Sequence, residues 1–202
     1  QNEMVRQAME DGVDVIVFSA VDYNANAEII GQAAQRGIKI IVIDSDVNSS
    51  QVSCRIGTNN LQAGIKAAEA ALATDDEELY IGIVNYDVNS ANGQQRELGF
   101  RQTVEQDPRV KDITTINVLS TTEDARTGAK EMLLSDSRIN VVVTFNEWTS
   151  LGVGWAIRDL NRADRIQVVA FDSNVVSVGM LETGEVDALI AVSYTHLTLP
   201  TN

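Results

Sequence analysis

The sequence contains a single cysteine and a single histidine among its 202 residues. With Cys54 as the only thiol, no internal disulfide can form, and with His196 as the only imidazole there is neither a Cys/His metal site nor a Cys–His nucleophile. Any other nucleophile would depend on a lysine or a carboxylate as its base. We therefore expect no enzyme, no metal and no cofactor, and we expect Cys54 to be a small buried apolar side chain.

No long apolar run, signal peptide or flexible linker is visible in this sequence. No run approaches the roughly 20 residues that a membrane-spanning helix requires. The opening QNEMVRQAMEDG has the pattern of the middle of an amphipathic helix, so we expect residue 1 to be an artificial start. Only two prolines and no Gly/Ser-rich stretch occur, so a domain boundary would be a short hinge, for which residues 57–60 are the candidate.

Basic residues are scarce. The chain has 15 Lys and Arg against 29 Asp and Glu, a net charge of −14 without any basic cluster. A phosphate backbone or an anionic membrane would be repelled, so nucleic acid is not an expected partner of this segment. Hydrophobic residues make up 44%, which is ample for one large or two modest globular cores. The acidic run at residues 75–78 is expected to be a solvated loop.

The strongest pattern in the chain is IKIIVIDSDV, residues 38–47. A run that is apolar at successive positions predicts a strand covered on both faces, as in parallel sheets. Such sheets bind ligands at the carboxyl ends of their strands, which places Asp44 at a ligand site unless it only begins a turn. The segment VVAFDSN places Asp172 in the same relation to a second strand.

Strand and helix patterns alternate along the whole chain. Strand starts recur at intervals of roughly 20 to 33 residues, the spacing that a crossover helix between parallel strands requires. The predicted fold class is therefore doubly wound α/β. The expected strands are 13–20, 38–47, 52–57, 79–84, 113–119, 139–145 and 166–171, and the expected helices are 4–11, 25–36, 61–73, 94–105, 124–134, 150–160 and 175–183.

Polar groups follow nearly every predicted strand. Amides and carboxylates dominate, and these suit a hydroxylated ligand because carboxylates accept hydroxyl protons while Asn and Arg donate to oxygens. Ordinary turn chemistry is the alternative for each one. The groups are Asp44, residues 85–89, residues 120–123, Asn146 with Glu147, and Asp172 with Asn174.

Residues 1–191 resemble the periplasmic sugar-binding proteins of the ribose-binding type, which share a fold with the effector domains of lactose-repressor-like regulators. The resemblance implies two doubly wound parallel-sheet lobes, a partial first lobe at 1–57 and a second at 58–191, that close on a sugar. In chain order it rests on GVDVIVFSAVDYNA, IIVIDSDV, IGTNNLQAG, QQRELGF, VVVTFNEWTSLGVGWAI, VVAFDSN and GMLETGEVDALIA.

The resemblance also implies a set of ligand-binding residues. Asp44 matches the first-lobe carboxylate, with Ser45 where ribose binders carry arginine, which argues against ribose. Arg96, Asn146 and Asp172 match the second-lobe half of the site, although Arg96 read alone could be a surface helix arginine. The stretch STTE stands where the family often has a stacking aromatic, and its Thr121 is a candidate ligand-binding residue. Trp148 is a candidate substitute, with helix packing as the alternative.

Both ends of the chain depart from the family. The family's first strand and helix would precede residue 1, so we expect the first lobe to be incomplete. The segment 192–202, VSYTHLTLPTN, stands where a Gln-containing segment is expected and looks like a translated sequencing adapter, which long reads across the gene would test.

Sugar binding for an ABC-type importer is the function that the resemblance implies. The protein would be periplasmic or lipid-anchored outside the cytoplasm, with a membrane permease as its partner. The alternative is a sugar-sensing regulator domain, which an upstream helix-turn-helix in place of a leader peptide would reveal. No Gly-rich phosphate loop follows a predicted strand, which argues against an enzyme.

Overall fold

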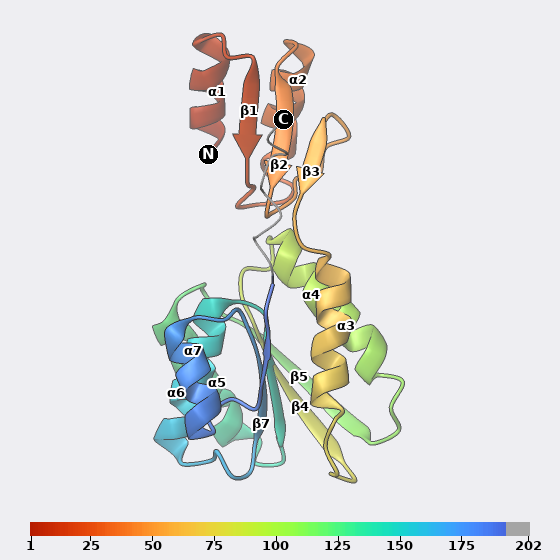
Figure 1. Cartoon of the computed structure of the whole chain (residues 1–202), viewed down its shortest axis with the longest axis vertical. Coiled ribbons are helices and arrows are strands. Elements are labelled where there is room, and N and C mark those ends of the chain that lie inside the picture. The colour runs from red at the N-terminus through yellow and green to blue at the C-terminus, as the bar shows by residue number, and fades with distance from the viewer. Residues whose placement is uncertain (193–202) are drawn as a thin grey trace, which may run out of the picture. The chain divides into compact units, whose positions relative to one another are not determined.

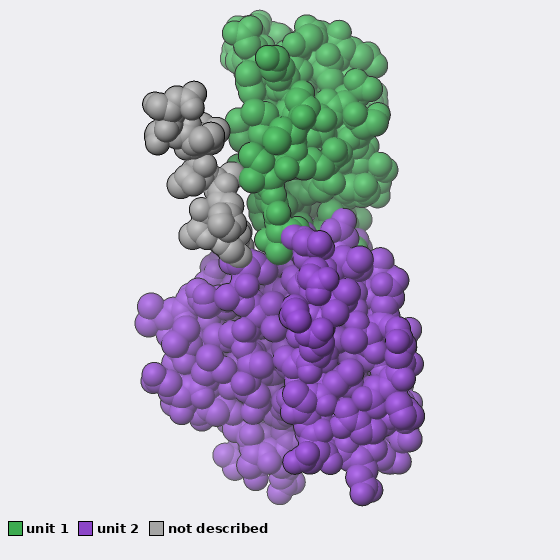
Figure 2. Space-filling view, turned by 45° about the vertical axis from the view of Figure 1, so that its right-hand side comes forward, with its two compact units in different colours: residues 1–58, 89–94, 193–202 green, residues 59–88, 95–192 purple. Residues whose placement is uncertain are grey.

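The computed structural model describes residues 1–192, so His196 and all of the predicted adapter tail except Val192 lie outside the described residues. The described chain forms two compact units (Figures 1 and 2). Unit 1 holds Gln1–Thr58 and Asn89–Gln94, and unit 2 holds Asn59–Val88 and Gln95–Val192. None of the helices in residues 1–192 is both long enough and apolar enough to span a bilayer.

Unit 1 is a three-stranded parallel sheet in the order β1-β2-β3, with two helices. Side chains from both helices form one core with alternate strand residues, among them Ile16, Ile40 and Val42. The elements are α1 (Asn2–Glu10), β1 (Val15–Phe18), α2 (Ala27–Gln35), β2 (Lys39–Ile43) and β3 (Cys54–Ile56).

Two sequence predictions are wrong in unit 1. The strands are not covered on both faces, because α1 and α2 share the core on one face and Val15 and Val17 of β1 remain 42% and 60% exposed. Cys54 is exposed as well, because β3 is a short edge strand whose residues all face solvent. Apolar runs in this unit therefore mark strands without marking burial on both sides.

Unit 2 is a five-stranded parallel sheet in the order β5-β4-β6-β7-β8, with helices on both faces. One core joins the sheet to α3 and α4, and the other joins it to α5, α6 and α7. Figure 1 shows these two groups of helices on either side of the unit 2 sheet. The elements are α3 (Asn60–Ala71), β4 (Leu79–Asn85), α4 (Ala91–Val104, of which residues 91–94 belong to unit 1), β5 (Val110–Asn117), α5 (Thr122–Ser135), β6 (Val141–Thr144), α6 (Glu147–Leu160), β7 (Gln167–Phe171), α7 (Val175–Thr183) and β8 (Ala188–Ile190).

The parallel α/β fold predicted from the sequence is confirmed, since every strand pairing in both sheets is parallel. Strand β6 is fully buried and β7 nearly so, as a two-sided sheet requires.

Several helices begin earlier than predicted because a polar side chain caps them. Asn146, for example, starts α6 at Glu147 through a capping box with Thr149.

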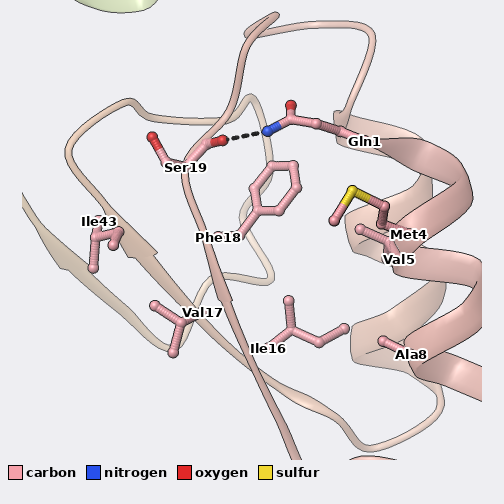
Figure 3. A pocket seen from close by; sticks show the side chains of 9 residues that line it. All are labelled: Gln1, Met4, Val5, Ala8, Ile16, Val17, Phe18, Ser19 and Ile43. Atoms are coloured by element: carbon pink, nitrogen blue, oxygen red, sulfur yellow. Dashed lines mark hydrogen bonds between the residues drawn. The ribbon is translucent and has the colours of Figure 1, made fainter. Parts of the chain in front are cut away.

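The free edge of β1 carries an apolar pocket of about 370 Å³ in unit 1 (Figure 3). Met4, Val5 and Ala8 of α1 line one side, and residues 16–18 of β1 together with Ser19 line the other. The Gln1 amide donates to the Ser19 carbonyl at 2.7 Å across the end of the pocket. Within residues 1–192, β1 pairs only with β2, so its other edge offers unpaired backbone groups beside exposed valines.

We expect the 202-residue chain to self-associate through this edge, because an exposed apolar strand edge can template pairing between chains. Val17→Lys places a charge in the centre of β1 and should raise the monomer fraction in sedimentation velocity experiments. The control is Val175→Lys, on a helical valine that is 90% exposed, which should leave the monomer fraction unchanged. A monomeric chain with one cooperative, stable unfolding transition would contradict this expectation.

A second prediction concerns Glu185, whose side chain is 8% exposed and accepts from Arg158 Nε at 2.6 Å. The hydrogen bond from Arg158, with a smaller effect of the Thr183 hydroxyl, holds the pKa of Glu185 below its ordinary value. Because the pKa of Glu185 is lower in the folded state than in the unfolded state, the ionised carboxylate stabilises the fold above the ordinary glutamate pKa of about 4.3. This stabilisation is lost as the pH falls through the lowered pKa of the folded state.

Glu185→Gln should therefore flatten the decline of Tm with falling pH below about pH 4.3. Thermal denaturation at a series of pH values measures this, with Glu182→Gln on an exposed residue of α7 as the control. Parallel Tm curves for the two variants would overturn the assignment.

Candidate functional site

The carboxyl ends of β4, β6 and β7 meet at one edge of the unit 2 sheet, since these strands are parallel neighbours. Strands β4 and β6 are adjacent although β5 lies between them in sequence, and this reversal of strand order is where open α/β sheets bind ligands. Asn146 follows β6 and Asp172 follows β7. The side chains just before them pack edge to face, with the ring centres of Phe145 and Phe171 5.7 Å apart.

Arg96 joins these strand ends. The side chain comes from α4, is 3% exposed, and donates from Nη1 to the Phe145 carbonyl at 2.6 Å. Its guanidinium carbon lies 4.9 Å from the centre of the Phe171 ring, and Nε donates to Asn60 Oδ1 at 2.8 Å. The alternative of a surface helix arginine is therefore wrong, and a fixed cation lies beside the residues that precede Asn146 and Asp172.

Asp172 has a backbone conformation unusual for a residue with a side chain. Its φ is 64°, in the left-handed region, which costs an L-residue roughly 1–2 kcal/mol and which Asp and Asn tolerate best. Its carbonyl accepts from Ser177 Oγ at 3.2 Å, which ties the turn to α7. Strained residues of this kind cluster at binding sites, so the conformation supports a functional position for Asp172.

Asp44 in unit 1 has the same conformation, with φ at 56° directly after β2. Its N–H donates to the Ile56 carbonyl at 2.9 Å, and Oδ1 accepts from Asn92 Nδ2 at 3.4 Å. Asp44 is exposed, whereas the neighbouring Ser45 is 8% exposed and accepts from the Ala20 N–H through its carbonyl. The repeated strand-Asp pattern in the sequence thus corresponds to a repeated backbone geometry.

Asn146 and Thr121 cap helices, as the turn-chemistry alternative stated. Asn146 Oδ1 accepts from the Thr149 N–H at 2.9 Å, and its Nδ2 donates to Ser120 Oγ at 2.7 Å. Thr121 Oγ1 accepts from the Asp124 N–H and is exposed at the start of α5. A ligand that contacts the Asn146 side chain would either replace one of these hydrogen bonds or form an additional one.

Trp148 lies in the first turn of α6 and is 48% exposed. Half of its surface is therefore accessible to a ligand or partner.

Sequence reasoning missed Asn60 and Asn92, which contact Arg96 and Asp44 respectively. The only signal for Asn60 was its place in IGTNNLQAG, where it was interpreted as part of a helix cap.

Other features of the described chain do not coincide with these residues. The apolar pocket of unit 1 is lined by none of the predicted site residues. Within residues 1–192, no group of His, Cys, Asp and Glu is arranged to hold a metal ion. Asp44, Asn146 and Asp172 are hydrogen-bonding residues that follow the ends of β2, β6 and β7, and they lie outside the apolar pocket of unit 1.

Comparison with known proteins identifies relatives along nearly the whole chain. Residues 1–198 match the family described as periplasmic binding protein domain. The ABC transporter periplasmic-binding protein YphF of Escherichia coli is 23% identical over 182 residues, which are 86% of this chain and 55% of that protein. A D-apiose import binding protein of Paraburkholderia graminis is 23% identical over 176 residues, which are 86% of this chain and 56% of that protein. The chain thus spans little more than half the length of these relatives.

A solved structure shows the same fold. The carbohydrate transporter solute binding protein from Agrobacterium radiobacter, in complex with D-arabinose, matches with a TM-score of 0.87 at 25% sequence identity. The match covers 92% of this chain and 64% of that one.

Proposed function

The chain belongs to the periplasmic binding protein domain family, and we propose that its gene product binds a small sugar or polyol for delivery to an ABC-type importer. The observation that carries this proposal is Arg96, buried and fixed between the strand ends that precede Asn146 and Asp172. Relatives named for import and a similar structure that holds D-arabinose point to the same ligand class.

The chemistry of the proposed site fits a molecule rich in hydroxyl groups. A hydroxyl both donates and accepts, so Asp172 would accept from it while Arg96 and the Asn146 amide would donate to its oxygens. Asp44 and Ser45, which follow β2, are further proposed ligand-binding residues. Trp148 is a further candidate as an apolar surface for a sugar ring, and Thr121 as a hydroxyl partner.

Import is favoured over sugar sensing by a transcription regulator. The relatives described above are named as transport or import proteins, and the net charge of −14 opposes binding of nucleic acid by this segment. We accordingly propose a location in the periplasm or at a lipid anchor outside the cytoplasm, with the importer's membrane permease as the partner. A leader peptide upstream in the gene would support this, and an upstream helix-turn-helix would favour the regulator.

Titration calorimetry of the complete gene product tests the proposal. A panel of pentoses, hexoses and cyclitols should contain at least one member that binds saturably without being converted. Binding of a peptide or nucleotide, with no member of the panel bound, would overturn the proposed ligand class.

A further inference from the structure

Asn60 and Arg96 form a buried polar pair in unit 2. Asn60 is the first residue of α3 and is 5% exposed, and its Oδ1 accepts from Arg96 Nε at 2.8 Å. Helix capping does not explain this bond, because the N-cap of α3 is Asn59, whose side chain accepts from the Gln62 N–H. The hydrogen bond from Arg96 to the Asn60 side chain therefore has a role other than capping α3, which Asn59 does.

The backbones of α3 and α4 are held in direct contact around this pair. A Cβ added to Gly64 of α3 would lie 2.0 Å from the Arg96 carbonyl oxygen. A Cβ added to Gly99 of α4 would lie 2.1 Å from the Leu61 carbonyl oxygen. Because each helix presents a glycine to the backbone of the other, the separation between Asn60 and the Arg96 main chain is set by backbone contact.

The guanidinium group of Arg96 is planar, so contacts that fix two of its nitrogen atoms also fix the direction of the third. Nε is bound to Asn60, Nη1 donates to the Phe145 carbonyl, and the group lies over the Phe171 ring. Arg96 Nη2 makes no hydrogen bond to the residues that the structure describes. Nη2 is thus the edge of the guanidinium left to donate.

We propose that Asn60 is a positioning residue for Arg96, and that it orients the guanidinium so that Nη2 donates to the bound ligand. The role in ligand binding rests on the proposed function, whereas the orientation of Arg96 does not. Removing the Oδ1 acceptor frees Nε and lets the guanidinium rotate, while an aspartate in its place restores an acceptor of the same shape.

The orientation is tested without sugar, by the exchange of the Arg96 Nε proton with water in ¹H–¹⁵N spectra of the complete gene product. Asn60→Ala should accelerate this exchange at least about tenfold, since a buried hydrogen bond is lost, and Asn60→Asp should leave it slow. Asn60→Ser removes less of this buried side chain than Asn60→Ala does, and it should also accelerate the exchange of the Arg96 Nε proton. Asn59→Ala is the control, because it should lower Tm through the lost cap without changing the Arg96 signal.

Ligand binding is then measured by calorimetry with the panel of pentoses, hexoses and cyclitols. Asn60→Ala should weaken the tightest sugar about tenfold, and Asn60→Asp should stay within about threefold of the unaltered protein. Unchanged Nε exchange in Asn60→Ala and Asn60→Ser would overturn the positioning role. Faster exchange with unchanged affinity would overturn the role of Nη2 toward the ligand. Faster exchange in a protein that binds no sugar would uphold the positioning and refute the proposed function instead.

Discussion

Asp172→Ala is expected to weaken sugar binding by about 10- to 150-fold, because each charge-assisted hydrogen bond contributes roughly 1.5 to 3 kcal/mol and each 1.4 kcal/mol is tenfold. Asp172 directly follows β7, whose last residue, Phe171, has its ring centre 4.9 Å from the Arg96 guanidinium carbon, and we propose that the Asp172 carboxylate accepts such bonds from hydroxyl groups. Calorimetric titration with the panel sugar that binds the unaltered protein measures the loss.

Two further variants separate the causes of that loss. Asp172→Asn removes the charge but tolerates the left-handed backbone at φ 64°, so it should retain Tm and still lose affinity. Asp76→Ala is the matched carboxylate control in the acidic loop that precedes β4, at the other end of the strands, where its Oδ2 accepts from Asn140 Nδ2. Equal losses for Asp172→Ala and Asp76→Ala would show that the proposed site is wrong.

Gly64→Ala is expected to destabilise unit 2 by about 1–3 kcal/mol or more, although alanine is ordinarily the better helix former. The added methyl group would lie 2.0 Å from the Arg96 carbonyl oxygen, and a backbone atom in a packed helix cannot move aside cheaply. The helices α3 and α4 would have to separate, which would also displace Arg96 from Asn60.

The matched control is Gly179→Ala, in the interior of α7 in the same unit. An added Cβ there meets nothing within 4 Å, so the substitution should stabilise the fold by about 0.5–1 kcal/mol. Urea denaturation of both variants gives the comparison. The close α3–α4 contact predicts midpoint shifts of opposite sign, and shifts in the same direction would refute it.

The alternation of strands and helices was determined by the sequence alone. Patterns such as VVVT in β6 and QVVAF in β7 are local, and continuous apolar residues predict burial on both faces when helices are available for each face. The positions of Asp44 and Asp172 after their strands were likewise local, because a strand end and its turn are adjacent in sequence.

Tertiary structure decided which surfaces are covered and which side chains meet. Val15, Val17 and Cys54 carry the apolar pattern of buried strands yet are exposed, because helices α1 and α2 share one face of the sheet and β3 is an edge. The contact of Asn60 with Arg96 joins residues 36 positions apart and depends on two helices meeting at Gly64 and Gly99. Periodicity along a chain specifies one element at a time, whereas these contacts arise only when separate elements pack, so no local pattern in the sequence encodes them.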